Sequence, residues 1–244
     1  MFYKNYSRRG IQKIHTSMSK KLFVVGTGTD VGKTYVTSLI VKKLYNAGIN
    51  VAYYKVAMSG NTKTANGEII PSDACFVKKM SGIKQPIHEM CKYVYEMPAS
   101  PHLASRHEKN YVNMHIIEES FRNVCKKYDY VTIEGSGGIV CPIRLDGEKI
   151  MLEDIIKNFD APCVIVADSS LGTINNVVLT SEYMKQKKIR TSGIIFNNFS
   201  PGDIIHGDNV AVCEQMTGIP IIAKIKRDDK EIDIDIQKLV SLYE

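Results

Sequence analysis

Gly26-Thr27-Gly28-Thr29-Asp30-Val31-Gly32-Lys33-Thr34 follows an apolar run at residues 22–25 and precedes a helical pattern at residues 35–47. A glycine-rich loop between a buried strand and a helix lets backbone N–H groups and the helix N-terminus face an anion. Lys33 adds a full positive charge, and Thr34 offers a hydroxyl to magnesium. The stretch therefore predicts a loop that binds the phosphates of a nucleotide.

The spacing of this loop differs from the ordinary P-loop pattern. That pattern has four residues between its first glycine and the Gly-Lys pair, whereas five residues separate Gly26 from Gly32. Glycine-rich turns from strand to helix also occur in α/β folds for structural reasons alone. Nucleotide binding is the favoured interpretation, because Gly-Lys-Thr here comes directly after a buried strand.

Apolar runs alternate with helical patterns along the chain. Runs suited to buried strands lie at residues 22–25, 51–54, 130–133, 163–167, 194–196 and 221–225. Helical patterns lie at residues 35–47, 113–127 and 174–187. This alternation predicts an α/β fold of the P-loop type, with a parallel β-sheet flanked by helices. Such sheets bind ligands at the carboxyl ends of their strands, so we expect the chemistry in the loops that follow them.

Three acids stand near these strand ends or at a helix start. Glu134 follows the strand at 130–133 and precedes a glycine-rich segment that we expect to be a flexible turn. An acid on a central strand must be paired or bound to a metal, so Glu134 is the first candidate magnesium ligand, with a cap or ion pair as the alternative. Asp73 begins a predicted helix, where it can also serve the helix dipole without a metal. Asp168 is a rival ligand.

A second lysine, Lys55, is expected to leave the strand at 51–54, with the hydroxyl of Ser59 a few residues further on. By itself such a lysine would be an exposed strand end. Beside a phosphate-binding loop it becomes a second clamp for negative charge that develops during phosphoryl transfer.

Composition excludes several other classes of protein. Residues 18–244 carry 28 basic and 26 acidic residues, and this net charge of +2 gives no reason to expect nucleic acid as a partner. No apolar run approaches the roughly 18 residues of a membrane helix. The six cysteines lie at least 16 residues apart, so we expect buried thiols in a reducing cytoplasm rather than a metal or redox motif.

Residues 1–17 are basic and contain no acid. They lack the apolar segment of a secretory signal, so we expect a disordered leader, with an upstream start codon or an organellar transit peptide as alternatives. We expect residues 18–244 to form a single domain, because no repeat or linker divides them.

Together these motifs resemble the dethiobiotin synthetase family over nearly the whole chain from Met18. The family's elongated loop, Gly-Thr-x-Thr-x-Val-Gly-Lys-Thr, matches residues 26–34, so the five-residue gap is the family's own. The other matching motifs are Tyr54-Lys55 with Ser59-Gly60, Ser72-Asp73-Ala74, Pro98-Ala99-Ser100-Pro101-His102, Ile133-Glu134-Gly135-Ser136-Gly137-Gly138, Leu171-Gly172-Thr173-Ile174-Asn175 and Asn197.

The resemblance implies an ATP-dependent ligase that closes the ureido ring of dethiobiotin from 7,8-diaminononanoate and carbon dioxide. ATP and Mg²⁺ are the implied cofactors. A substrate amine takes up carbon dioxide as a carbamate, the carbamate attacks the γ-phosphate, and the second amine displaces phosphate. The resemblance also implies a homodimer with the substrate site at its interface, and neither nucleic acid nor a membrane is expected as a partner.

The resemblance further implies roles for single residues. Lys33, Lys55 and Thr29 would act on the reacting groups, and Thr34, Asp73 and Glu134 would hold magnesium. The implied nucleotide-binding residues are Gly28, Thr29, Asp30, Val31, Gly32, Lys33, Thr34 and, against the base, Asn197. The implied substrate-binding residues are Ser59, Gly137, Gly172 and Asn175, of which the last two would hold the substrate carboxylate at a helix start.

Four positions depart from the family pattern. Val56, Asn176 and Asn198 stand where the family often has proline, histidine and an acid, and residues 223–226 replace its usual Gly-x-Ile-Pro. A nonfunctional or sensory homologue stays open, since fold and motifs do not prove turnover, and so do two other classes. One is a cobyrinate-type amide synthase, which would need a glutaminase. The other is a partition-type ATPase that switches binding to DNA or membrane.

Overall fold

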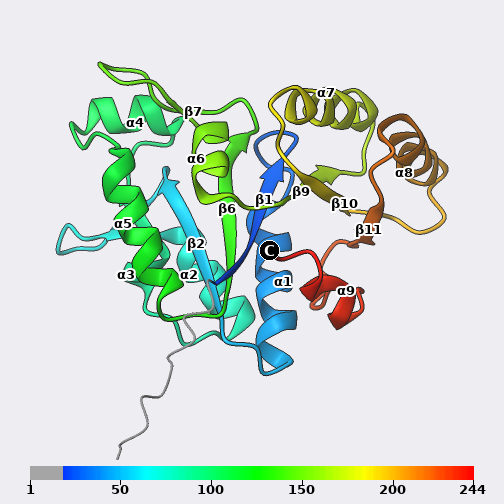
Figure 1. Ribbon diagram of the computed structural model, residues 1–244, viewed down its shortest axis with the longest axis horizontal. Helices are drawn as coiled ribbons and strands as arrows, with labels where there is room; N and C mark the ends of the chain where they lie inside the picture. The colour runs from blue at the N-terminus through cyan, green and yellow to red at the C-terminus, as the bar shows by residue number, and fades with distance from the viewer. Residues whose placement is uncertain (1–18) are drawn as a thin grey trace, which may run out of the picture.

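A parallel sheet of seven strands runs through the computed structural model, which describes residues 19–244. The strand order is β11-β10-β9-β1-β6-β2-β5, with β1 near the middle (Figure 1). All the strands expected from apolar runs are present, and the predicted α/β fold is confirmed. The bounds are β1 Lys20–Gly26, β2 Val51–Met58, β5 Cys91–Val94, β6 Tyr130–Gly138, β9 Cys163–Asp168, β10 Thr191–Asn197 and β11 Ile221–Lys224.

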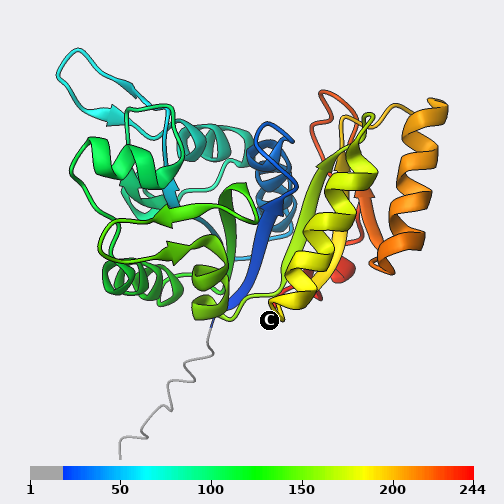
Figure 2. The same cartoon turned by 90° about the horizontal axis from the view of Figure 1, so that it is seen from above.

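Helices cover both faces of this sheet. Buried residues of α1 (Lys33–Asn46), α2 (Ser72–Ser81) and α9 (Ile236–Val240) belong to one apolar cluster. Buried residues of α5 (Met114–Cys125), α6 (Leu152–Phe159) and α7 (Thr173–Gln186) belong to a second cluster. The remaining helices are α3 (Ile87–Met90), α4 (Pro101–His107) and α8 (Ile204–Thr217). Seen from above, α7 and α8 lie at one end of the sheet (Figure 2).

Two small antiparallel pairs extend from this frame. The pair β3 (Thr62–Lys63) and β4 (Ile69–Ile70) forms a hairpin that projects at the end of the molecule opposite α8 (Figure 2). The second pair joins β7 (Pro142–Arg144) and β8 (Ile150–Met151), between β6 and α6 in the chain.

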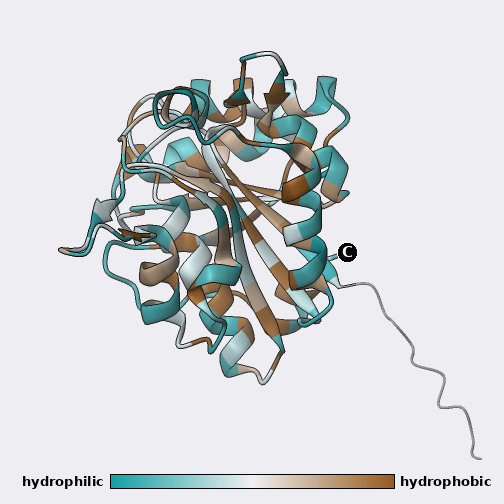
Figure 3. Ribbon diagram, turned by 90° about the vertical axis from the view of Figure 1, so that its left-hand side faces the viewer, coloured by the Kyte–Doolittle hydropathy of each residue, from teal (hydrophilic) through white to brown (hydrophobic). Residues whose placement is uncertain are grey.

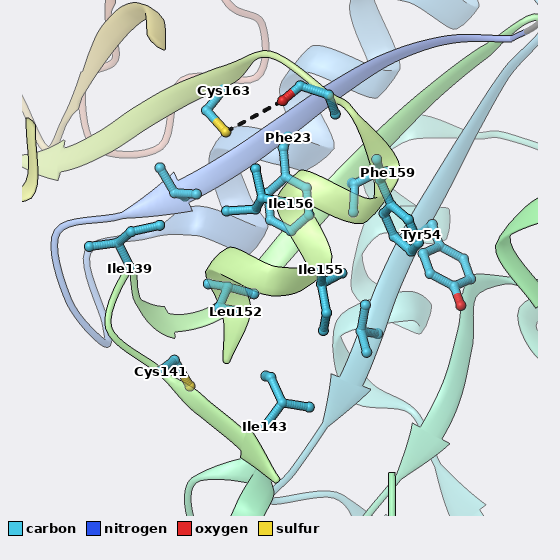
Figure 4. Close-up of a cluster of buried hydrophobic side chains, with 14 of the residues drawn as sticks. Phe23, Tyr54, Ile139, Cys141, Ile143, Leu152, Ile155, Ile156, Phe159 and Cys163 are labelled. Carbon is cyan, nitrogen blue, oxygen red and sulfur yellow. Dashed lines mark hydrogen bonds between the residues drawn. The ribbon is translucent and has the colours of Figure 1, made fainter. Parts of the chain in front are cut away.

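The core consists of the two apolar clusters, one on each face of the sheet. Figure 3 shows apolar residues along the strands and hydrophilic residues on the outer sides of the helices. Within the cluster under α5 and α6, the ring of Tyr54 packs against Phe159 at 6.2 Å between centroids (Figure 4). Phe121 stacks on Phe159 at 3.8 Å and also lies 5.2 Å from Tyr54, so the three rings form one group. Burial of such aromatic surface holds the helices on the sheet.

Two expectations about strand ends were wrong. Lys55 does not leave β2, because the strand continues to Met58. Glu134 does not precede a flexible turn, because residues 135–138 belong to β6 despite their glycines. The physical reason is pairing: Glu134 lies opposite Val24 of β1 on one side and Lys55 of β2 on the other. This pairing keeps Lys55 and Glu134 within the sheet, so both side chains are buried rather than placed on a loop. After Glu134 the register to β1 shifts, and Gly137 has a left-handed φ of +63°.

The remaining expectations concern the leader, the thiols and the membrane. The leader predicted at residues 1–17 lies outside the described residues. All six cysteines are free; Cys75 and Cys125 are partly exposed, and the other four are buried as expected. In the range 19–244, no helix combines the length and apolarity needed to cross a membrane.

Candidate active site

The glycine-rich loop joins the end of β1 to the start of α1. Gly32 is the N-cap of α1 and has φ of +89°, a left-handed conformation that favours glycine. A Cβ atom at this position would lie 2.1 Å from the side-chain nitrogen of Asn197. That nitrogen donates a hydrogen bond to the carbonyl of Val31 at 3.2 Å. Asn197, at the end of β10, therefore contacts the loop closely, and its side chain leaves room only for glycine at position 32.

Lys33 is the first residue of α1 and its side chain turns back over the loop. Its Nζ donates a hydrogen bond to the carbonyl of Gly28 at 2.7 Å. Burial, and after it the charge of Lys55, lowers the pKa of Lys33 from 10.5 to about 8. Anionic phosphate oxygens beside this ammonium group would favour its charged form.

Glu134, Thr34, Lys55 and Asp73 form one connected polar cluster. Glu134 Oε1 accepts hydrogen bonds from Thr34 Oγ1 and from Lys55 Nζ, each at 2.7 Å. Lys55 Nζ also donates to Asp73 Oδ2 at 2.7 Å. Burial alone would lower the pKa of Lys55, but Glu134 and Asp73 raise it above its ordinary value. Lys55 is therefore a charged ammonium group held between two carboxylates.

The second oxygen of Glu134 has a partner that the sequence analysis missed. Tyr53 is fully buried, and its hydroxyl donates to Glu134 Oε2 at 2.9 Å. Burial, followed by the charge of Glu134, raises the pKa of Tyr53 well above its ordinary value, so the phenol keeps its proton and remains a donor. The sequence did offer a signal for this residue. Side chains two positions apart on a strand point to the same face of the sheet, so Tyr53 and Lys55 share one face.

A second missed residue, Asn61, holds the start of α2. Its amide nitrogen donates to the carbonyls of Met58 and Tyr95 at 3.1 and 2.8 Å. Its oxygen accepts from the backbone nitrogen and the hydroxyl of Ser72, both at 2.9 Å. Asn61 thereby caps α2 from outside the helix and fixes the turn that carries Asp73. A buried asparagine after a strand gives little indication of this role in the sequence.

A cavity of about 440 Å³ opens above these groups. Most of the predicted site residues line it: Thr29, Asp30, Gly32, Lys33, Thr34, Lys55, Ser59, Asp73, Glu134 and Gly137. Tyr35, Ala57 and Ser136 complete the lining, and none of these was expected. The structure thus brings the expected phosphate, metal and reacting-group residues together at the carboxyl ends of β1, β2 and β6.

The other predicted residues lie elsewhere. Gly28 and Val31 belong to the loop but contribute carbonyls to Lys33 and Asn197 rather than lining the cavity. Gly172 and Asn175 lie at the start of α7, where Gly172 is the N-cap, and they are not among the lining residues.

Asp168, the rival metal ligand, is occupied by other partners. Its Oδ1 accepts from the backbone nitrogen of Ser170 at 2.9 Å, and its Oδ2 accepts from the side chain of Asn198 at 2.7 Å. Asp168 does not line the cavity. Asp168 thus links the segment that follows β9 to the segment that follows β10, which is a structural role for its carboxylate.

The oxygens of Thr34, Asp73 and Glu134 suit magnesium, a hard cation that binds oxygen ligands and usually completes its shell with phosphates and water. Within the described part of the chain, no group of three or more His, Cys, Asp or Glu side chains is arranged to hold a metal. A site with two carboxylates and one hydroxyl fits an ion that arrives with a nucleotide. In the present arrangement Lys55 pairs with both carboxylates, and its single positive charge offsets one of their two negative charges.

The side-chain oxygen of Asn197 offers a further acceptor. It is buried and has no hydrogen-bond partner among residues 19–244. An unpaired buried acceptor costs free energy, about 1–3 kcal/mol, unless a ligand or water supplies a donor. The side-chain oxygen of Asn197 is therefore suited to accept a hydrogen bond from an N–H group of a ligand.

The fold, the loop and the cluster of lysines and acids define a P-loop nucleotide-binding protein. Accordingly, a protein family described as an AAA domain matches residues 20–232. Among solved structures, a ParA family ATPase from Chlorobium tepidum covers 91% of this chain and 90% of its own, with a TM-score of 0.54 and 16% identity. The MinC:MinD cell division protein complex of Aquifex aeolicus gives a TM-score of 0.52, 15% identity and coverage of 87% and 83%. At such identities the likeness shows the fold alone.

Sequence relatives are more specific. An ATP-dependent dethiobiotin synthetase of Clostridium botulinum is 44% identical over 227 residues, which are 93% of this chain and 99% of that protein. A protein of the same name from Brachyspira hyodysenteriae is 44% identical over 222 residues, 88% and 98% of the two chains. The chain belongs to the ATP-dependent dethiobiotin synthetase family, as its motifs predicted. The amide-synthase and partition-ATPase alternatives gain no support from these relatives.

Proposed function

We propose that this protein is a C–N bond-forming ligase that makes dethiobiotin from 7,8-diaminononanoate, carbon dioxide and ATP, with release of ADP and phosphate. The observation that carries the proposal is the convergence of Lys33, Lys55, Thr34, Asp73 and Glu134 on one cavity. The relatives named ATP-dependent dethiobiotin synthetase, matched over nearly the full chain, support the choice of reaction.

The glycine-rich loop and Lys33 bind the ATP phosphates. Backbone N–H groups at the start of α1 face the anion, and the side chain of Lys33 exchanges its bond to Gly28 for phosphate oxygens. Because Lys33 is buried, its interaction with phosphate is screened little by solvent. This arrangement holds the γ-phosphate at the cavity.

Lys55 stabilises the reacting carbamate. One substrate amine adds to carbon dioxide and loses a proton, and a carbamate oxygen then attacks the γ-phosphorus as ADP leaves. The second amine attacks the carbonyl carbon of this mixed anhydride, and phosphate leaves as the ring closes. No protein nucleophile is required, so Lys33, Lys55, Thr29 and Ser59 act by positioning and by stabilising negative charge.

Thr34, Asp73 and Glu134 hold magnesium in this proposal. The ion, when bound, neutralises phosphate charge and polarises the group under attack. Lys55 pairs with Asp73 Oδ2 and Glu134 Oε1, so it would compete with a bound ion for these oxygens. Once displaced from the carboxylates, the Lys55 ammonium group would be available to the carbamate.

Asn197 contacts the nucleotide base. Its unpaired oxygen is an acceptor that fits the exocyclic amino group of adenine and not the carbonyl oxygen that guanine presents at the same position. This pairing supports ATP as the nucleotide, although Asn198 and residues 223–226 depart from the family pattern.

A homodimer completes the substrate site in this proposal. The residues expected to hold the substrate carboxylate, Gly172 and Asn175, do not line the cavity. Leu171, just before Gly172, is 86% exposed, and Leu179 of α7 is 62% exposed. Single exposed leucines are ordinary on a protein surface, so it is their place beside the expected carboxylate-binding residues that supports an interface here. We therefore propose that the start of α7 from one protomer lies at the cavity of its partner. We also propose that the enzyme is cytoplasmic.

The test is a reconstituted reaction with purified protein, Mg-ATP, bicarbonate and 7,8-diaminononanoate, followed by mass spectrometry and phosphate release. We expect dethiobiotin and phosphate in equal amounts. Lys33→Ala should abolish both, whereas Lys42→Ala should leave both unchanged, since Lys42 is a half-buried lysine of α1 that does not line the cavity. ATP binding without any diamine-dependent product would overturn the proposed reaction.

A further inference from the structure

The two oxygens of Glu134 are divided between different neighbours. Oε1 faces the cavity side, where it accepts from Thr34 and Lys55 at 2.7 Å each. Oε2 faces the protein interior, where it accepts from the hydroxyl of Tyr53 at 2.9 Å. This division settles the orientation of the carboxylate, since rotation about its last bond would break the inner contact.

Tyr53 is itself held rigidly. Its backbone N–H donates to Gln85 Oε1 at 2.8 Å, and its carbonyl accepts from Gln85 Nε2 at 3.0 Å. Its ring is fully buried in the apolar cluster with residues of α1 and α2. A side chain anchored at both ends presents its hydroxyl at one place, whether or not a ligand is bound.

We propose that Tyr53 is a positioning residue that fixes Glu134 for the divalent cation accompanying the nucleotide. With Oε2 bonded to Tyr53, only Oε1 is presented to the site, beside the hydroxyl of Thr34. Partners of metal ligands that orient them in this way typically change metal affinity about 10–100-fold when removed. The inference rests on the proposed role of Glu134 as a magnesium ligand.

Tyr53→Phe and Tyr54→Phe form a matched pair for the test. Both remove one buried hydroxyl from adjacent residues of β2. The Tyr54 hydroxyl points to the other face of the sheet, where it reaches the carbonyl of Ile117 at 3.5 Å and the side chain of Ser120. Any general effect of removing a buried hydroxyl from this strand should be common to both variants.

The measurement is Mn²⁺ binding by electron paramagnetic resonance, in the presence of β,γ-imido-ATP and without diamine, so that no turnover is needed. We expect Tyr53→Phe to weaken Mn²⁺ binding about tenfold and Tyr54→Phe to leave it unchanged. Thermal unfolding of each variant reports separately on stability. Unchanged Mn²⁺ affinity in Tyr53→Phe, with or without a lower unfolding temperature, would overturn the inference.

Glu134→Gln and the double variant separate this inference from the proposed function. If Tyr53 acts through Glu134, adding Tyr53→Phe to Glu134→Gln causes no further loss of Mn²⁺ affinity. An additive loss means that Tyr53 acts by another route and overturns the inference alone. If Glu134→Gln itself leaves Mn²⁺ affinity unchanged, the proposed metal role of Glu134 fails, and the inference fails with it.

Discussion

At position 32 the backbone has φ of +89°, and the amide of Asn197 occupies the space that a Cβ atom would need. Gly48, at the end of α1, has φ of +77° and open space around it. Alanine at either position adopts a left-handed conformation at a cost of about 1–2 kcal/mol. We expect Gly32→Ala to lose ATP binding as well, because the overlap of the new Cβ atom with Asn197 displaces the loop. Gly48→Ala should be less stable than the native protein but should bind ATP as well as it does. Calorimetric titration with ATP checks this, and equal ATP affinity in both variants would contradict it.

Lys33 makes the nucleotide-free protein pH-dependent. The unfolded chain keeps this proton up to about pH 10.5, whereas the folded protein releases it near pH 8. Between these values the unfolded state binds more protons, so stability rises with pH. We expect Lys33→Met to be more stable than the native protein at pH 7, by at most about 3 kcal/mol, with the difference vanishing near pH 10.5.

Urea unfolding of nucleotide-free protein at several pH values measures this difference. Lys42→Met is the control, since Lys42 is a half-buried lysine on the same helix that donates to the carbonyl of Lys230 at 2.9 Å. A native protein more stable than Lys33→Met at pH 7 would show that the Gly28 contact outweighs the cost of burying the charge.

At the scale of elements, Glu153 ties α6 to α7. It pairs with Lys187, the C-cap of α7, at 2.7 Å and accepts a hydrogen bond from Tyr183. Burial alone would raise the pKa of Glu153, but hydrogen bonds from Lys187 and Tyr183 hold it below its ordinary value of 4.5. A carboxylate with a lowered pKa stabilises the fold above about pH 4.5, and that stability is lost as the pH falls through its folded value.

We expect Glu153→Gln to be less stable than the native protein at pH 7 and to lose less further stability between pH 5 and pH 3. Thermal unfolding midpoints across this range provide the measurement. Glu182→Gln, which removes an exposed pair with Lys185 at 3.8 Å, should follow the native curve. Parallel curves for Glu153→Gln and the native protein would exclude Glu153 as a source of acid sensitivity.

At the scale of the whole molecule, the proposed homodimer makes each site from two protomers. Lys33→Ala removes the phosphate contact on one side. Asn175→Asp places a negative charge where the substrate carboxylate is expected on the other. Each homodimer should be inactive, but random exchange of the two variants leaves roughly a quarter of the sites intact. We expect mixing to restore about that share of dethiobiotin formation.

Native mass spectrometry of the mixture provides the control, because it shows whether mixed dimers have formed. Mixed dimers without recovered activity would place the cavity and α7 contributions in one protomer. Recovery that requires mixed dimers would show that the cavity and the α7 residues of one site come from two protomers.

Most strands and the longest helices of the site were predictable, because their signals are local. Among the elements that were missed, α6 has a clear apolar pattern in Leu152, Ile155, Ile156 and Phe159, whereas β5 and α8 have weak ones. β5 is a four-residue edge strand that contains the exposed Lys92, and α8 buries little along its length while Ile204 and Met216 face outward. A short edge strand and a helix without an apolar stripe carry little periodic signal.

The sequence by itself determined the phosphate-binding loop, the α/β fold and the family. A nine-residue loop carries its conformation and its charge within itself, and alternation of strands and helices leaves few ways to form a sheet. Only the tertiary structure decided how Glu134 is used. Thr34 and Tyr53, which bond its two oxygens, lie 100 and 81 residues away along the chain. Their meeting depends on the register between β1, β6 and β2, and no local pattern specifies register between strands so far apart in sequence.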